Sequence, residues 1–419
     1  MKRYTSVEGV VPRAAFVVVA LIAASTVTSA QSPATLPGEC NRPFAEPITV
    51  IKLPNRGMGV VPTRDGCWAF VGFVQRQDVS GGSGVGVLRR TGDTFEEVRV
   101  VPVPGNPNNP YGLALTRDQK VLVVSHFRQV SFFDVEKLTT GQGDPLLGQV
   151  SGPRIDYTFG VSITPDDRYA FVAQGALASV VIIDLEKGRI SGFDSSTLVG
   201  VVPGVFRPSV TVLSRDGRFL YFANKQPPDV VSPSRTCLGG KQPEGVVQIV
   251  DAHRARSGGE SATIGFASAG CEPNTVTLSP DGARLSVVAP GVANILSPQA
   301  SPADSALVVF DVRDGKTATL LGKVPLPRIP AAVVDTGNRI VVGLIGSDLA
   351  VIDPSKVSLG GGAIIGLIPV TAGAGLVLKP DGHTLLGLAG GLNPRGPGLV
   401  IVDLDRAPVQ PMTSQTAAK

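Results

Sequence analysis

One short pattern recurs along this chain: an apolar run, a turn that contains Asp, and a second apolar run. The fullest copy is TLSPDGARLSVV, at residues 277–288. After most copies comes another apolar stretch that ends in Asp, such as SVVIIDL at 179–185. A unit repeated along a whole chain constrains the fold more than any single motif does. The other copies lie at 62–73, 115–127, 163–174, 213–224, 333–344 and 378–390.

Each unit predicts a strand, a turn, a second strand, a loop, a third strand and a more variable fourth. The period of roughly 45 to 65 residues is in the range of propeller blades. An antiparallel blade cannot bury both of its faces alone, so the units must stack, and a closed ring needs no capping repeat. The 50 Gly and 35 Pro punctuate a chain that is 43% hydrophobic, as many tight turns require. We therefore predict an all-β fold, a seven-bladed β-propeller.

The two ends of the repeat region predict how the ring closes. The last copy ends with GLVIVDLDRAPVQ (398–410), which is too short to supply a fourth strand. A strand-like run, PITVIKLP (47–54), precedes the first copy and has no place in the first blade. We expect this N-terminal strand to complete the last blade. The domain limits are then 31–46 for an N-terminal segment, 47–410 for the propeller and 411–419 for a loose tail.

The first thirty residues resemble a signal peptide rather than part of the fold. Basic residues precede the apolar run AAFVVVALIAAS (14–25), and small residues lead to a cleavage site after Ala30. A membrane anchor is the alternative, but this run is shorter than the roughly 18 residues that span a bilayer. We expect export, to the periplasm or beyond the cell, with no transmembrane segment after cleavage.

Four cysteines can pair in three ways, and the blade topology favours one of them. We call the face with the loops that enter first strands and join second to third strands the top face, and the opposite face the bottom. Cys40 and Cys67 belong to the bottom, and Cys237 and Cys271 to the top, so the expected disulfides are Cys40 with Cys67 and Cys237 with Cys271. Reduced or metal-bound cysteines are the alternative, but no CxxC spacing supports a zinc or redox site.

Alignment of the copies on the turn Asp shows a polar sector in blades two, three and four. Eight residues after the Asp these blades carry hydrogen-bonding side chains, where the others have Phe73, Ala289, Leu344 and Ala389. Nine residues before it they again carry polar or aromatic side chains. We predict a ligand or partner site there; the alternative is that these groups satisfy loop backbone and channel water. The six residues are Asn109, His126, Tyr157, Gln174, Arg207 and Asn224.

Other chemical motifs are scarce. His126, His253 and His383 are the only histidines, and the topology keeps them too far apart to bind one metal. Gly-rich runs lack the strand-to-helix context of a phosphate-binding loop. We therefore predict no catalytic residue, no metal and no cofactor. A net charge of +4, spread along the chain, gives no reason to expect nucleic acid.

Four loops between second and third strands are enlarged and rich in Gly, Pro, Ser and Gln. Long loops on a rigid scaffold are common places for function, although tolerated insertion is the alternative for each. They lie at 75–85, 225–245, 290–305 and 390–398.

The repeat resembles the YVTN-type, WD40-like β-propeller repeats of exported bacterial and archaeal proteins. PSVTVLSRDGRFLYFAN (208–224) carries the likeness, with YFAN where the family signature stands. The resemblance implies a propeller and export but no single activity, because such propellers have unrelated functions.

We therefore expect a monomeric, non-catalytic scaffold that binds a protein or a small molecule through its top face. The alternative is a hydrolase, because lactonase-type propellers have similar SPDG turns. The chain departs from those enzymes at CEPNTVTLSPDG (271–282), which lacks their His-bearing segment, and at VVAPGVA (287–293), where an acidic loop is expected.

Overall fold

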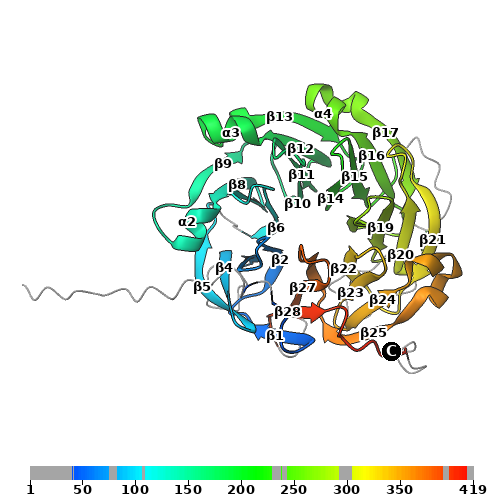
Figure 1. Ribbon diagram of the computed structural model, residues 1–419. Helices are drawn as coiled ribbons and strands as arrows, with labels where there is room; N and C mark the ends of the chain where they lie inside the picture. The colour runs from blue at the N-terminus through cyan, green and yellow to red at the C-terminus, as the bar shows by residue number, and fades with distance from the viewer. Residues whose placement is uncertain are drawn as a thin grey trace, which may run out of the picture. The chain divides into compact units, whose positions relative to one another are not determined.

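The computed structural model describes Cys40 and residues 42–74, 83–105, 109–228, 237, 243–291, 304–389 and 396–412. From these residues it builds seven four-stranded antiparallel sheets arranged as blades around a central opening (Figure 1). The predicted all-β, seven-bladed propeller is confirmed. The expected signal peptide, most of the expected tail and much of the four enlarged loops lie outside the described residues.

The strands follow one another from the inner to the outer edge of each blade. Blade one is β2 (Gly57–Pro62), β3 (Trp68–Phe73), β4 (Gly84–Thr91) and β5 (Thr94–Pro102); blade two is β6 (Pro110–Leu115), β7 (Val121–His126), β8 (Gln129–Asp134) and β9 (Leu146–Ser151); blade three is β10 (Thr158–Ile163), β11 (Tyr169–Gln174), β12 (Ser179–Asp184) and β13 (Leu198–Pro203); blade four is β14 (Thr211–Leu213), β15 (Phe219–Asn224), β16 (Val246–Asp251) and β17 (Thr263–Ser268).

The remaining blades continue the order. Blade five is β18 (Thr275–Leu278), β19 (Arg284–Ala289), β20 (Ala306–Asp311) and β21 (Thr319–Pro325); blade six is β22 (Pro330–Asp335), β23 (Ile340–Leu344), β24 (Asp348–Ile352) and β25 (Ile364–Thr371); blade seven is β26 (Ala374–Leu378), β27 (Thr384–Ala389), β28 (Gly398–Asp403) and β1 (Ile48–Lys52).

Short helices join third to fourth strands in four blades. They are α2 (Val135–Thr140) in blade two, α3 (Leu185–Ser191) and η1 (Ser195–Thr197) in blade three, α4 (Ala252–Gly258) and η2 (Gly259–Ala262) in blade four, and η4 (Pro354–Ala363) in blade six. No helix of the described residues is long and apolar enough to cross a membrane.

The N-terminal strand closes the ring as predicted. β1 pairs antiparallel with β28, from Ile48 opposite Val402 to Lys52 opposite Gly398, and the two strands lie side by side in Figure 1. Arg90 holds the segment before β1, because its guanidinium donates to the carbonyls of Cys40 and Arg42 at 2.6 and 2.7 Å. Residues from both ends of the chain thus share the last sheet.

Both predicted disulfides, Cys40 with Cys67 and Cys237 with Cys271, are present. Each bridge joins a segment outside the strands to a neighbouring turn or loop, across 27 and 34 residues of sequence. A crosslink of this length stabilises a fold by about 2 to 4 kcal/mol, chiefly by restricting the unfolded chain.

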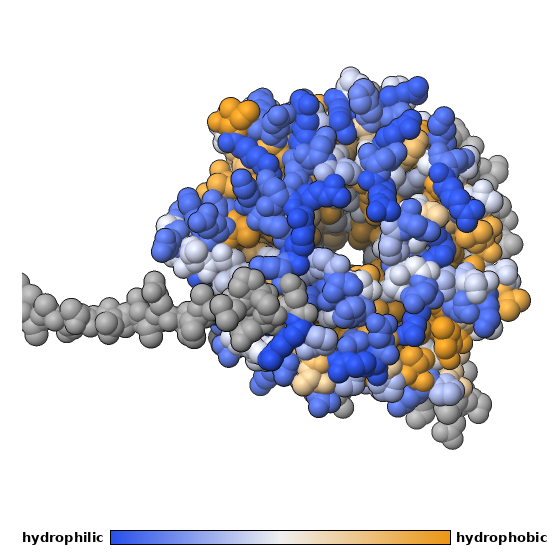
Figure 2. Space-filling view, viewed as in Figure 1, coloured by the Kyte–Doolittle hydropathy of each residue, from blue (hydrophilic) through white to orange (hydrophobic). Residues whose placement is uncertain are grey.

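The repeated Asp residues shape turns on the bottom face. Asp281 accepts hydrogen bonds from the Ser279 hydroxyl at 2.5 Å and from the Ala283 amide at 3.0 Å. Gly282 follows with φ of 75°, a conformation that favours glycine. The hydrogen bond from Ser279 lowers the pKa of Asp281, and the same Ser or Thr to Asp contact recurs in other blades. Figure 2 shows hydrophilic side chains around the central opening on the face that it draws.

The core lies between adjacent blades. Second and third strands are buried along nearly their whole length, as in β15 and β16. Tyr221 and Ile249 of blade four, for example, pack with Leu285 and Val308 of blade five. Burial of both faces explains why these strands are continuous apolar runs rather than alternating ones.

A bulge in the outer strand explains most of the large apolar side chains that are exposed there. In blade four, Ile249 pairs with Gly265 and Val250 pairs with Thr263, so Ile264 has no partner and is 39% exposed. Bulges twist an edge strand and hinder its pairing with other chains. The equivalent unpaired and exposed residues in blades one, three, five and six are Val98, Val199, Leu321 and Ile365.

Candidate functional site

The centre of the ring contains a cavity of about 970 Å³, a size typical of small-molecule or peptide sites. Its wall consists of side chains from first strands, such as Leu113, Val161 and Leu376. Its mouth consists of top-face residues, including Arg56, Tyr157, Arg207 and Lys225. The cavity therefore has an apolar shaft and a polar, aromatic rim.

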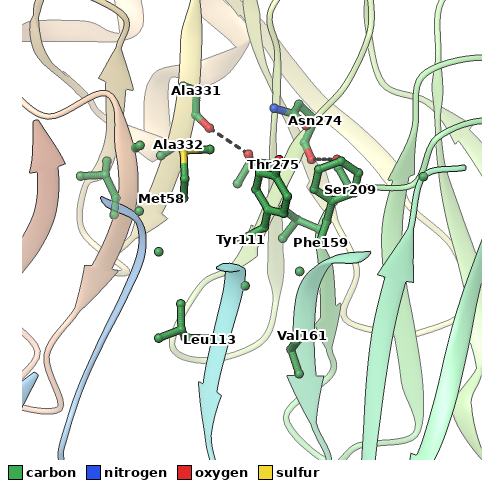
Figure 3. Close-up of a pocket in the computed structure, with 18 of the residues that line it drawn as sticks. Met58, Tyr111, Leu113, Phe159, Val161, Ser209, Asn274, Thr275, Ala331 and Ala332 are labelled. Carbon is green, nitrogen blue, oxygen red and sulfur yellow. Dashed lines mark hydrogen bonds between the residues drawn. The ribbon is translucent and has the colours of Figure 1, made fainter. Parts of the chain in front are cut away.

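Four aromatic side chains gather on the wall that blades two and three form. The Tyr157 ring meets Phe127 and Phe159 edge to face, with centroids 5.1 and 4.8 Å apart. Tyr111 lies 5.4 Å from Phe159, and in Figure 3 both rings border the cavity near Met58. Burial raises the pKa of Tyr111, which keeps its hydroxyl protonated. This wall offers ring faces and edges that stack on flat or apolar groups.

The residue nine positions before the turn Asp, which we call the entrance residue, stands where the chain enters each first strand. In blades three, four and five this residue has a left-handed backbone: φ is 54° at Tyr157, 47° at Arg207 and 54° at Glu272. Bulky residues seldom adopt this conformation, so the surrounding structure must hold it. The complete series from blade one to blade seven is Arg56, Asn109, Tyr157, Arg207, Glu272, Ile329 and Ala372. The spacing differs in blade six, where Ile329 is the residue directly before β22.

We call the residue that ends each second strand the strand-end residue, and in blades three and four its side chain supports the loop above it. In blade three the Gln174 side-chain oxygen accepts the Asp156 amide at 3.1 Å, next to Tyr157. In blade four the Asn224 oxygen accepts the amide of Val205 at 2.9 Å and, more weakly, that of Phe206 at 3.4 Å, next to Arg207. In these two blades the strand-end side chain is thus hydrogen-bonded to the residues directly before the entrance residue.

His126 occupies the strand-end position of blade two. Its Nε2 lies 2.8 Å from the Ser131 hydroxyl, and the side chain is 1% exposed. Gln174 makes the equivalent contact with Ser179 at 2.7 Å. Burial lowers the pKa of His126 to about 4, so the ring is neutral near pH 7.

The rim has two guanidinium groups with no nearby carboxylate. Arg128 lies 3.4 Å from Asp156, and Lys225 lies 3.7 Å from Glu272, so those two cations are paired. Among the described residues, no carboxylate lies within ion-pair distance of Arg56 or Arg207. The rim therefore favours an anionic group.

Three large apolar side chains are exposed on the top face of blades three and four. Tyr157 and Phe206 are each 37% exposed, and Leu177, in the turn between β11 and β12, is 43% exposed. None of them belongs to a strand bulge, so strand geometry does not explain their exposure. Exposed apolar groups clustered on one face commonly mark a binding surface.

The structure divides the six predicted site residues into two groups. Tyr157 and Arg207 line the cavity, and Asn109 contacts the Tyr111 side chain, which lines it. His126, Gln174 and Asn224 are at most 1% exposed and lie beneath the loops. Sequence reasoning missed Arg56 and Glu272, which the same alignment would have found in blades one and five. It also missed Tyr111, Phe127 and Phe159.

A cluster with metal-ligand chemistry lies on the bottom face. Atoms of His383, Asp403 and Asp405 lie within 4.8 Å of one another. Arg406 Nε lies 2.6 Å from Asp403 Oδ2, and Asp403 Oδ1 accepts the amides of Asp405 and Arg406. The buried carboxylate thus has a cationic partner already, which disfavours a bound cation.

Fold and cavity define a seven-bladed β-propeller with a central cavity. The chain is similar to a solved structure of hydrazine synthase from Kuenenia stuttgartiensis, with 17% identity and a TM-score of 0.60 over 83% of this chain and 96% of that one. It is also similar to U3-55K, with 12% identity and a TM-score of 0.60 over 87% and 100%.

A third similar structure is the Cps50 (Swd1) β-propeller domain of Myceliophteria thermophila, with 14% identity and a TM-score of 0.58 over 84% and 98%. At such identities the likeness concerns the fold alone. No family model matches the chain, and no curated protein matches it either.

Proposed function

We propose that this protein is an exported, non-catalytic scaffold that binds a partner through the top face of blades two, three and four. The observation that carries the proposal is the exposed apolar group of Tyr157, Leu177 and Phe206 beside the cationic Arg207. Aromatic side chains and Arg are enriched among the residues that dominate binding energy at interfaces. Structural neighbours that include WD40 repeats support a scaffold role.

The rim and shaft also suggest the chemistry of the partner. A carboxylate would pair with Arg207 or Arg56, and an apolar side chain beside it would reach the aromatic wall at Tyr157. A guanidinium binds a carboxylate through two parallel hydrogen bonds, which gives the contact direction as well as energy. The partner in this proposal is a protein segment that presents an acidic residue next to an apolar one.

Two further features support export. Two disulfides fit an oxidising compartment, and the YVTN-type resemblance of residues 208–224 agrees with it. The hydrolase alternative gains no comparable support, because His126 is buried, bonded to Ser131 and absent from the cavity lining.

Site-specific photo-crosslinking tests the proposal. A photoreactive amino acid at Leu177 should crosslink one protein from a cell-envelope extract, and Arg207→Ala should reduce the yield at least tenfold. The matched control is the same group at Ile190, which is 82% exposed in α3 and lies away from the top face. Equal crosslinking at both positions, or no effect of Arg207→Ala, would contradict top-face binding. Metal-dependent lactone hydrolysis that disappears in His126→Ala would favour the hydrolase instead.

A further inference from the structure

The outer strand of most blades is covered by another segment of the same chain. After the bulge, the next outer-strand residue is glycine in blades two to six: Gly148, Gly200, Gly265, Gly322 and Gly366. At four of these a backbone carbonyl takes the place of a side chain. A Cβ would lie 2.4 Å from Phe193 O at Gly148, 3.0 Å from Ala255 O at Gly200, 2.3 Å from Val357 O at Gly322 and 2.3 Å from Gln410 O at Gly366.

Hydrogen bonds strengthen this covering in two blades. The Gln149 amide, next to Gly148, donates to the Phe193 carbonyl at 2.8 Å. Leu367, next to Gly366, exchanges two backbone hydrogen bonds with Gln410, each of 2.8 Å. Two outer strands of this fold thus already pair with a segment of the chain at or next to the glycine. Phe193 pairs in parallel with Gly148 of β9, and Gln410 pairs antiparallel with Leu367 of β25.

Blade four is the exception. Among the residues that the structure describes, no atom lies within 4 Å of the position that a Cβ would take at Gly265. The covering segments of blades two, three and five come from the connection between third and fourth strands of the next blade, and that of blade six comes from the chain after β28. The equivalent connection for blade four lies in blade five and is only a short turn between Asp311 and Thr319. β17 is one of two outer strands without a single buried residue, the other being β1.

The missing connection also leaves an apolar side chain exposed. Leu198 of blade three packs with Phe193 of its own connection, and Ile364 of blade six packs in the cluster of Val357. The equivalent Leu320 of blade five has no such partner among the described residues and is 56% exposed. Leu320 is therefore an exposed apolar side chain of blade five at the position where Leu198 packs with Phe193 in blade three.

The two uncovered strands differ in their protection against pairing. β1 includes Lys52 and lies between Pro47 and Pro54, residues that hinder strand addition. β17, with the sequence TIGFAS, has neither charge nor proline, and its only protection is the bulge at Ile264. The same bulge in β9 and β25 does not prevent a segment of this chain from pairing at the following residues.

Beside Ser268, the last residue of β17, Lys323 and Glu244 neutralise each other at 2.9 Å, and the Ser268 hydroxyl donates to Glu244. The edge thus favours an occupant that carries no net charge.

We propose that the β17 edge is a second interaction surface, which binds an extended segment of a partner polypeptide that carries no net charge. In this arrangement a backbone carbonyl of the segment sits over Gly265 and accepts the Phe266 amide, as Phe193 O accepts that of Gln149. A large apolar side chain of the segment packs on Leu320, as Phe193 packs beside Leu198. This surface does not depend on the top-face site.

A peptide taken from the chain's own covering segment is the probe. GRISGFDSST, residues 188–197 with blocked ends, contains the Phe193 that covers β9. At millimolar concentration it should slow amide hydrogen exchange at Phe266 at least about fivefold, and the same peptide with Ser in place of Phe193 should not. Hydrogen exchange at the Gln149 amide, which is already bonded to the Phe193 carbonyl, is the internal reference.

Two variants make the result decisive. Gly265→Val should fold normally, because the Cβ meets no atom and φ is not left-handed, yet it should abolish the peptide effect. Leu320→Lys should weaken it, and this side chain is exposed enough to tolerate the change. Unchanged exchange at saturating peptide, or equal slowing in Gly265→Val, would overturn the proposal. So would a dimer by light scattering that Gly265→Val dissociates, because a second copy would then be the occupant.

Discussion

The mouth of the channel has two arcs that share one backbone design but differ in chemistry. In blades two to four the strand-end residues are buried and polar; those of blades three and four, Gln174 and Asn224, hold the loops through hydrogen bonds, and Tyr157 and Arg207 stand at the rim. In blades six and seven the same positions are Leu344 and Ala389, with Ile329 and Ala372 at the entrance. Apolar packing is therefore sufficient to build the mouth.

The difference teaches that a blade of this chain can form without a polar strand-end residue. A buried side-chain amide contributes little to the net stability of the fold when its hydrogen bonds are satisfied, and it lowers the stability substantially when a partner is lost. Such an amide does fix the geometry of the loop that it contacts, because hydrogen bonds are directional and dispersion interactions are not. We infer that the polar arc is retained for the loop conformations that it imposes at Tyr157 and Arg207.

The largest effect is expected on the apolar arc. Leu344 is fully buried, so Leu344→Ala should lower the free energy of unfolding by about 2 to 5 kcal/mol through lost transfer energy and a cavity. Partner crosslinking at Leu177 should persist, since the polar arc is intact. Denaturant unfolding and crosslinking measure the two effects. A loss of crosslinking in the folded variant would mean that both arcs form the binding surface.

Acid should weaken the polar arc through His126. Its pKa is about 4 in the fold and near 6.5 when unfolded, so the unfolded chain takes up the proton first. This contribution to stability is fully present above pH 6.5 and declines as pH falls to 4, by about 3 kcal/mol in total.

The His126→Gln variant isolates that contribution, because Gln174 makes the equivalent contact in blade three. Unfolding measured between pH 7 and 4 should lose the corresponding part of its pH dependence in this variant. An identical pH profile in both proteins would show that His126 is not the titrating group.

Asn224→Ala should have a smaller effect on stability and a larger one on the rim. It leaves the Val205 and Phe206 amides without their acceptor, which costs about 1 to 3 kcal/mol. Hydrogen exchange at these amides should accelerate, and crosslinking at Leu177 should fall. Leu344→Ala is the matched control, since it destabilises the fold without touching this loop.

The smallest effect is expected at the exposed cations of the rim. Arg207→Ala and Arg56→Ala should change the free energy of unfolding by less than about 0.5 kcal/mol, as surface substitutions usually do. Thermal unfolding checks this. A larger loss would show that these side chains are structural and would remove them from the proposed binding surface.

Most of the fold could be predicted because it is repeated. Seven copies of one pattern indicated seven blades, and the spare run at 47–54 indicated the strand that closes the ring. The cysteine pairing followed from the faces on which the topology places each residue. The bulges and the uncovered edge of β17 could not be read from the pattern, because a connection in one blade covers a strand in the preceding blade.

The sequence by itself determined the architecture and the two rows of positions at the mouth, since both depend on residue spacing along strands. Only the tertiary structure decided what these rows do. Tyr157 and Arg207 face the cavity because of a left-handed backbone that Gln174 and Asn224 support from below. Burial depends on neighbours that are distant in the sequence. The entrance residues therefore form an exposed rim and the strand-end residues a buried support, although the pattern spaces both rows equally.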